Sequence, residues 1–223
     1  MQFNEAQIQA IQHNTGPCMV IAGPGSGKTT VLTHRVRYLI ERYGVNPSDI
    51  LVITFTKAAA EQMKLKFKGL SEGRNFAVTF GTFHAVFFTI LKAAYNYSAH
   101  CIIKPQIQHE FVKDQMCRLE LEYDDENEAV AGVLSEISCV KGEAVNIDEY
   151  ESRCIPPQSF RIMYRAYDDM LVRKHLIDFD DMIVQCRELL MQREDYRRAW
   201  QNKYKYILID EFQDINKAQF DVV

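Results

Sequence analysis

The segment Cys18–Thr30, CMVIAGPGSGKTT, decides the fold of this chain. An apolar run at residues 19–22 leads into a glycine-rich loop, Gly23–Gly27, which is followed by Lys28, Thr29 and an amphipathic helical pattern. A phosphate-binding loop requires a strand, a loop and a helix in that order. Glycines let backbone N–H groups turn toward an anion, and the helix N-terminus adds positive partial charge. The segment therefore predicts a strand at residues 19–22 and a nucleotide phosphate site directly after it.

The loop residues predict how a nucleotide is held. Lys28 is expected to reach the β- and γ-phosphates, and the Thr29 hydroxyl to take one coordination position on Mg²⁺. Ala22 departs from the strict pattern, which has a glycine five residues before Gly27. A glycine-rich turn that happens to precede Lys-Thr is the alternative. The residues expected to bind the ATP phosphates are Gly23, Pro24, Gly25, Ser26, Gly27, Lys28, Thr29 and Thr30.

The composition restricts the class of protein. Hydrophobic residues make up 47% and charged residues 25% of the 223 residues, as in ordinary globular proteins. No apolar run approaches the length of about 18 residues that a membrane span needs, and the N-terminus has no basic leader. The six cysteines form no CxxC pair, which favours reduced thiols and a cytoplasmic location. The net charge of −4 means that nucleic-acid binding would need a local basic patch.

The strand and helix patterns predict an α/β fold with a parallel sheet. Short β-branched or apolar runs at residues 50–55, 76–80 and 206–209 are expected as further strands. Between about residues 95 and 200 helical patterns dominate, so an all-helical insert is expected between core strands. The expected domains are 1–94 for the first part of the core, 95–202 for the helical insert and 203–223 for the second part of the core.

A carboxylate pair ends the last predicted strand. Residues 206–209 run into Asp210-Glu211-Phe212-Gln213-Asp214. Because open α/β sheets bind ligands at the C-terminal ends of their strands, we expect Asp210 to hold Mg²⁺, usually through water. Glu211 is expected to orient and deprotonate the attacking water. Acidic residues that merely finish a strand are the alternative, and the GPGSGKT segment in the same chain argues against it.

Gln7 has a structural explanation of its own. Asn4 and Gln7 have the spacing of a capping box at a helix start, and Phe3 and Ile8 could form the accompanying hydrophobic staple. From these residues alone, capping is the favoured role of Gln7.

Three further polar segments can likewise be explained by local structure alone, without a function. Thr56 opens a helix at residues 57–68, in which four lysines stand against Glu61 alone; this is either a basic patch or a solvated helix face. His84 lies at a strand-to-helix junction, and Asp178–Asp181 is typical of a helix cap cluster.

Five motifs in this order resemble those of the UvrD/Rep/PcrA helicases of superfamily 1. They are GPGSGKT at Gly23–Thr29, TFTKAAAE at Thr54–Glu61, GTFH at Gly81–His84, DFDD at Asp178–Asp181 and DEFQD at Asp210–Asp214. The starting segment FNEAQIQAI is similar to the adenine-reading Q motif of that family, in which alanine is also familiar at the place of Ala22. The resemblance implies a RecA-like P-loop NTPase core, the 1A subdomain, split around a helical 1B subdomain. It implies an ATP-dependent 3′→5′ DNA helicase or single-stranded DNA translocase, in DNA repair or replication restart.

The resemblance also assigns roles to single residues. Gln7 is implied to read the adenine edge, and Gln213 to sense the γ-phosphate and couple it to motion on DNA, beside the catalytic Glu211 and Lys28. The implied partner is single-stranded DNA or a junction of single and double strands. Cationic, hydroxyl and aromatic groups suit such a strand. The residues implied to line its path are Phe55, Thr56, Lys57, Phe83 and His84.

In the family, a further core strand and a second RecA-like domain follow the DEFQD segment. The 223 residues are therefore expected to be an N-terminal part of a longer motor, nearly inactive without that second domain. The further strand normally lies between the phosphate-loop strand and the strand at 206–209. Without it, these two are expected to pair abnormally, to leave an open slot or to borrow a strand from a neighbouring chain, with self-association.

More than one function class is compatible with the sequence. A small-molecule kinase would account for Lys28 and Thr29, but not for Glu211, Gln213 or the GTFH segment. A non-enzymatic module that binds ATP or single-stranded DNA would fit the same motifs, and so would the helicase part of a helicase–nuclease.

Overall fold

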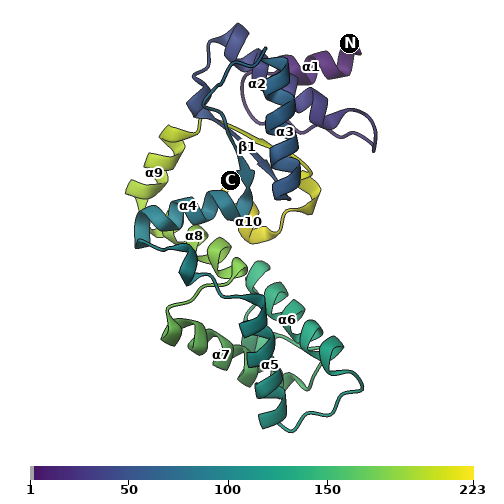
Figure 1. Cartoon of the computed structure of the whole chain (residues 1–223), viewed down its shortest axis with the longest axis vertical. Coiled ribbons are helices and arrows are strands. Elements are labelled where there is room, and N and C mark those ends of the chain that lie inside the picture. The colour runs from purple at the N-terminus through teal and green to yellow at the C-terminus, as the bar shows by residue number, and fades with distance from the viewer. Residues whose placement is uncertain (1–2) are drawn as a thin grey trace. The chain divides into compact units, whose positions relative to one another are not determined.

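A computed structural model describes residues 3–223, which Figure 1 shows as a ribbon coloured from purple at the N-terminus to yellow at the C-terminus. Contacts divide the chain into two compact units. The first consists of the chain up to Val86 together with Arg193–Asp214, and the second of Phe87–Gln192 and Ile215–Val223. The domain boundaries expected at 94/95 and 202/203 lie later in the chain than these divisions. The assignment of the units to 1A and 1B subdomains stays a prediction.

The first unit is built on a parallel sheet, which within the described residues has three strands in the order β2–β1–β3. β1 spans Ile50–Thr54, β2 spans Thr79–Thr82 and β3 spans Tyr206–Ile209. Leu51 of β1 lies opposite Ile207 of β3. Every residue of β1 is buried, as expected for a central strand with a neighbour on each side. The predicted α/β fold with a parallel sheet is confirmed, although β2 begins later than the run at residues 76–80.

Helices with apolar faces pack against this sheet. The helices of the first unit are α1 (Glu5–Gln12), α2 (Lys28–Tyr43), α3 (Lys57–Leu70) and α9 (Glu194–Lys203), with 3₁₀ turns η1 (Pro47–Asp49) and η4 (Phe212–Asp214). α2 and α3 bury side chains against β1 and β3; the core residues are Val36, Leu39, Ile50, Val52, Met63, Phe67 and Leu208. Helix α4 (Phe83–Tyr95) begins in the first unit and continues into the second.

The strand expected at residues 19–22 is absent, because these residues have no strand partner in the described part of the chain. Met19, Val20 and Ile21 are 69%, 56% and 93% exposed. A strand persists only where a neighbour accepts and donates its ladder hydrogen bonds, and the ladder partner of β3 is β1 alone. The prediction that residues 19–22 pair abnormally with β3 is therefore wrong. These residues have no strand partner among the described residues.

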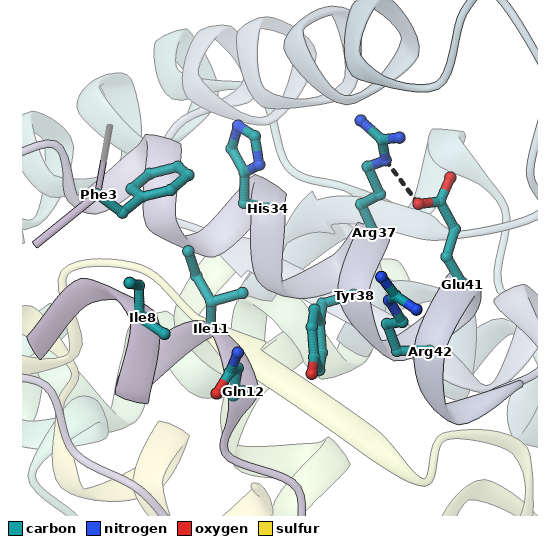
Figure 2. A pocket seen from close by; sticks show the side chains of 9 residues that line it. All are labelled: Phe3, Ile8, Ile11, Gln12, His34, Arg37, Tyr38, Glu41 and Arg42. Atoms are coloured by element: carbon teal, nitrogen blue, oxygen red, sulfur yellow. Dashed lines mark hydrogen bonds and ion pairs between the residues drawn. The ribbon is translucent and has the colours of Figure 1, made fainter. Parts of the chain in front are cut away.

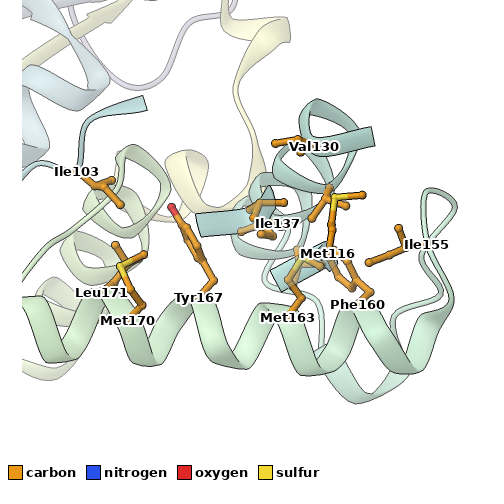
Figure 3. Close-up of a cluster of buried hydrophobic side chains, with 13 residues drawn as sticks. Ile103, Met116, Val130, Ile137, Ile155, Phe160, Met163, Tyr167, Met170 and Leu171 are labelled. Atoms are coloured by element: carbon orange, nitrogen blue, oxygen red, sulfur yellow. The ribbon is translucent and has the colours of Figure 1, made fainter. Parts of the chain in front are cut away.

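The second unit is helical. It contains most of α4 together with α5 (Pro105–Arg118), α6 (Glu126–Gly142), α7 (Pro157–Lys174), α8 (Phe179–Gln192) and α10 (Lys217–Val222), and the 3₁₀ turns η2 (Ala99–Cys101) and η3 (Ile147–Glu149). Figure 3 shows its core, in which Met116, Ile137 and Phe160 from three different helices are buried together. The helical character expected for this part of the chain is confirmed. No helix formed by residues 3–223 is long and apolar enough to cross a membrane.

The DFDD segment begins α8 and encloses a buried lysine. Asp178 Oδ1 accepts a hydrogen bond from the backbone N–H of Asp181 at 2.6 Å, and Asp181 Oδ2 accepts one from the N–H of Asp178 at 3.2 Å, which confirms the capping role. Lys141 Nζ of α6 lies 2.9 Å from Asp178, 2.7 Å from Asp181 and 3.1 Å from Asp168 of α7. Burial alone would lower the pKa of Lys141, but the three carboxylates outweigh it and raise that pKa. The segment therefore joins three helices of the second unit through one buried charge.

Candidate nucleotide and DNA site

The phosphate loop has the backbone that an anion site needs. Gly25 and Gly27 have φ angles of 74° and 85°, in the left-handed region that favours glycine. Gly27 precedes α2, and no side chain caps that helix start. The first three N–H groups of α2, those of Lys28, Thr29 and Thr30, have no acceptor within the helix. These free donors and the helix dipole fit a phosphate group.

Lys28 and the DEFQD segment meet in the first unit. Lys28 Nζ lies 3.2 Å from Glu211 Oε2, and the side-chain amide of Gln213 donates to the same oxygen at 2.7 Å. Hydrogen bonds from Gln213 and then Lys28 lower the pKa of Glu211, so its carboxylate is ionised at neutral pH. Glu211, two residues after the end of β3, has a φ of 52°, a left-handed conformation that is uncommon for a residue other than glycine. Two residues 183 positions apart in sequence are thus in contact, as the sequence predicts for one ATP site.

Asp210 follows β3 and is more enclosed than Glu211. Burial raises the pKa of Asp210, and the neighbouring charge of Glu211 raises it further. Its Oδ1 accepts a hydrogen bond from the N–H of Glu211 at 3.2 Å. A Mg²⁺ ion next to this carboxylate would favour its ionised form. Within residues 3–223 no group of three or more His, Cys, Asp or Glu side chains is arranged for a metal. Thr29 and Asp210 could thus supply only part of a coordination shell, which suits Mg²⁺ because it keeps waters and phosphate oxygens as ligands.

Gln7 joins α1 to the phosphate loop. The capping box with Asn4 is present: Asn4 Oδ1 accepts from the N–H of Gln7 at 2.9 Å, and Gln7 Oε1 accepts from the N–H of Asn4 at 3.0 Å. Gln7 Nε2 also donates to the carbonyl of Ser26 at 3.1 Å. The capping role is confirmed, and the adenine-reading role stays a prediction.

Two cations near the loop belong to none of the sequence motifs. The guanidinium of Arg35, on α2, donates to the carbonyls of Ala10 and His13 at the end of α1. Lys66 Nζ, on α3, donates to Thr30 Oγ1 at 2.6 Å. Arg35 thus fixes α1 to α2, and Lys66 fixes α3 to the residue after Thr29. Neither partner is close in sequence, so spacing alone could not reveal these contacts.

A hollow of about 260 Å³ lies between α1 and α2. Figure 2 shows its side chains; they are Phe3, Ile8, Ile11, Gln12, His34, Arg37, Tyr38, Glu41 and Arg42. The rings of Phe3 and His34 meet edge to face, with centroids 4.8 Å apart. Burial, and then the charges of Arg37 and Lys66, lower the pKa of His34, so its ring is neutral at pH 7. The lining contains none of the phosphate-loop residues, so this hollow is not the phosphate site.

The residues implied to line the DNA path differ in accessibility. Phe55 is 36% exposed, and its ring meets that of Phe83 edge to face at 5.7 Å. Phe83 is only 2% exposed, which corrects its predicted role: its ring cannot stack on a base here and instead supports Phe55. Thr56 caps α3, because its Oγ1 accepts from the N–H of Ala59 at 3.1 Å. Lys57 is exposed.

His84 is half-buried at the start of α4. Burial lowers the pKa of its imidazole, so at neutral pH it offers no positive charge to a phosphate. Its neighbours Gly81 and Thr82 lie in β2, whose end is paired with the end of β1 at Ile53 and Thr54. The GTFH and TFTK segments therefore lie side by side at the C-terminal edge of the sheet.

Comparisons with known proteins show the family of this chain. A profile of the UvrD/REP helicase N-terminal domain matches residues 3–223. The chain belongs to the UvrD/Rep helicase family. The ATP-dependent DNA helicase Rep of Escherichia coli is 34% identical over 232 residues, which cover 100% of this chain and 34% of Rep. The ATP-dependent DNA helicase PcrA of Staphylococcus epidermidis is 33% identical over 227 residues, 99% of this chain and 31% of PcrA.

A third UvrD/Rep relative, YjcD of Bacillus subtilis, is 34% identical over 233 residues, which cover 99% of this chain and 30% of YjcD. The chain thus spans about a third of the length of these curated relatives. The resemblance to the UvrD/Rep/PcrA helicases is confirmed at the level of the family and of its N-terminal domain.

Proposed function

We propose that this chain is the ATP-binding part of a 3′→5′ DNA helicase or single-stranded DNA translocase that acts in the cytoplasm, in DNA repair or replication restart. The observation that carries the proposal is the contact between Lys28 of the phosphate loop and Glu211 after β3, 3.2 Å apart. A phosphate loop alone serves many reactions, but a carboxylate placed beside the loop lysine supplies the base that hydrolysis needs.

The residues of the site divide the work of ATP hydrolysis. The free N–H groups at the start of α2 hold phosphate oxygens, and Lys28 exchanges its contact with Glu211 for the β- and γ-phosphates. Thr29 and Asp210 would hold Mg²⁺, which would supply positive charge to neutralise the phosphates. Glu211, released from Lys28, then accepts a proton from the attacking water. Gln213 already contacts Glu211 at 2.7 Å and responds to the γ-phosphate through it.

Gln7 has hydrogen-bonding capacity left for the adenine. Its Oε1 accepts one hydrogen bond and its Nε2 donates one, so each atom can make one more. Adenine offers an N6–H donor beside the N7 acceptor, which is the matching pair. Gln7 thus combines capping of α1, contact with the loop and recognition of the base.

The DNA strand is proposed to cross the C-terminal edge of the sheet. The exposed ring of Phe55 stacks on a base, with Phe83 packed against it, and Lys57 and the start of α3 face a phosphate. Thr56 caps α3 through its hydroxyl oxygen, which accepts the N–H of Ala59, and its O–H group can donate to a phosphate. This path shares the C-terminal edge of the sheet with Glu211, which follows β3 and contacts Lys28 of the phosphate loop.

One set of binding measurements tests the proposal against its alternatives. The 223-residue chain is expected to retain labelled ATP and an oligo-dT strand in filter binding, whereas Lys28→Ala retains only the DNA. A small-molecule kinase would bind ATP without DNA, and this result would refute the proposal.

Turnover separates a motor domain from a binding module. We expect little hydrolysis by the 223 residues alone, because the family resemblance implies that arginines of a second RecA-like domain complete the site. Joining a second RecA-like domain, which the family resemblance implies, is expected to give DNA-stimulated hydrolysis. Hydrolysis that DNA does not stimulate would contradict the motor assignment.

A further inference from the structure

The exposed flank of α3 carries a row of lysines that the ATP site does not use. Lys57, Lys64 and Lys68 recur at helical spacing with Glu61 between them, so all four lie along one line of the helix. All four side chains are exposed. None of the three lysines has an ion-pair partner among residues 3–223. In a chain of net charge −4, this lysine row is a local cationic surface.

The lysine row is held rigidly and faces away from α2. Ala60, Met63 and Phe67, which are 6%, 0% and 4% exposed, anchor α3 to the core. At about 100° per residue, Lys66 lies on one side of this buried face and the lysine row on the other. Lys66 reaches Thr30 on α2, so the lysine row occupies the opposite flank.

The lysine row continues the predicted DNA path, because Lys57 belongs to both. Thr56 is the N-cap of α3, Phe55 precedes it, and Lys57 is the first helical residue. From Lys57 to Lys68 the row runs about 16 Å along the helix axis, at about 1.5 Å per residue. A nucleic-acid strand carries one phosphate per nucleotide, so the row spans several successive charges.

We propose that the lysine row of α3 binds the phosphates of a single DNA strand and extends the path that starts at Phe55. The proposal rests on the proposed function, since the ligand is the same strand. Lys57 holds the phosphate next to the stacked base, and Lys64 and Lys68 hold those further along. The path thus leaves the sheet edge along α3, on the flank away from the phosphate loop.

The test uses the 223-residue chain with Lys64 and Lys68 both changed to glutamine. Fluorescence anisotropy of a labelled 20-nucleotide oligo-dT strand, at several salt concentrations, gives the affinity and its salt dependence. Each phosphate contact contributes about −0.7 to the slope of log K against log salt for a single strand, so the slope should become about 1.4 shallower. If the two proteins bind the strand equally at 1 M salt, the same rule predicts that the double variant binds it roughly tenfold more weakly than the unchanged chain at 0.2 M salt.

A matched control removes the same charge elsewhere. Lys104 and Lys174 are exposed helix-end lysines of the second unit, and neither has an ion-pair partner within residues 3–223. Lys104→Gln with Lys174→Gln should leave affinity and slope as in the unchanged chain. Thermal unfolding of both double variants checks that the fold is intact.

The outcomes separate the two proposals. If the unchanged chain binds the strand and Phe55→Ala weakens it, but the Lys64/Lys68 double variant matches its control, the lysine row is only a solvated surface and this inference is wrong. If the unchanged chain does not bind the strand at all, the proposed function falls as well.

Discussion

Replacing Lys141 with methionine should strongly destabilise the second unit, because it leaves buried carboxylates without their cation. The Lys141 side chain is 4% exposed, Asp178 is 3% and Asp181 is 18% exposed. Removing one partner of a buried charge network typically costs about 3–5 kcal/mol. Asp168 is 40% exposed and remains solvated, so we place the loss in the free energy of unfolding at about 4 kcal/mol at pH 8.

The pH dependence gives this prediction a second readout. In the unchanged chain, burial and the charge of Asp178 raise the pKa of Asp181 to about 6, while Lys141 opposes them. Without Lys141 that pKa rises further, and a tenfold change in acidity corresponds to about 1.4 kcal/mol. An acid with a raised pKa binds a proton in the folded state before it does so in the unfolded state, so its protonation stabilises the fold as pH falls. The stability difference between the two chains should therefore shrink by about 1 kcal/mol or more between pH 8 and pH 6.

Urea unfolding followed by circular dichroism at both pH values measures these quantities. Lys174→Met, which removes an exposed lysine of α7, is the control and should change stability by less than about 0.5 kcal/mol. Lys141→Met with Asp178→Asn should recover part of the loss, because it removes an uncompensated charge. If Lys141→Met matches the control, or if its effect is the same at pH 8 and pH 6, the buried network does not hold the helices together as argued.

Two further substitutions test the site in the first unit. Glu211→Gln should tighten ATP binding by about two- to fivefold, since ATP no longer competes with a carboxylate for Lys28 and exposed ion pairs are weak. Isothermal titration measures this change, with Glu194→Gln as the control, and an unchanged Kd would contradict it. Phe55→Ala should weaken binding of oligo-dT by about tenfold or more, because base stacking on an aromatic ring contributes about 1–3 kcal/mol. Fluorescence anisotropy of the labelled strand measures that loss. Val172→Ala, which shortens another exposed apolar side chain, is the control. Equal affinities of the two variants for the strand would exclude stacking of a base on Phe55.

Features that depend on nearby residues were predictable. The capping box of Asn4 and Gln7 and the reciprocal caps of Asp178 and Asp181 each follow from spacings of three residues. The strand Tyr206–Ile209 follows from an apolar run between polar residues. The contact of Lys28 with Glu211 was predictable because a phosphate-loop lysine and a carboxylate that ends a strand are expected to serve one ATP site.

Features that depend on distant partners were not predictable. The apolar run at residues 19–22 has the composition of a strand, but it forms none because no described strand pairs with it. Phe83 carries the aromatic ring expected of a DNA contact, yet packing buries it and leaves Phe55 exposed. Lys66 looked like one member of a basic cluster, whereas it contacts Thr30 across the interface of α2 and α3.

The sequence by itself determined the family, the phosphate loop, the carboxylates that follow β3 and the α/β class, because each depends on residue types at fixed short spacings. Only the tertiary structure decided which residues of the DFDD, GTFH and lysine-rich segments are buried and which are exposed. In the folded chain, Asp178 and Asp181 form ion pairs with the buried Lys141. Phe83 is buried whereas Phe55 is partly exposed. The lysine row of α3 is exposed on one flank of that helix, whereas Lys66 contacts Thr30 on the other. The physical reason is that burial, hydrogen-bond partners and the pKa of each group depend on atoms that are distant in sequence and meet only when the chain is folded.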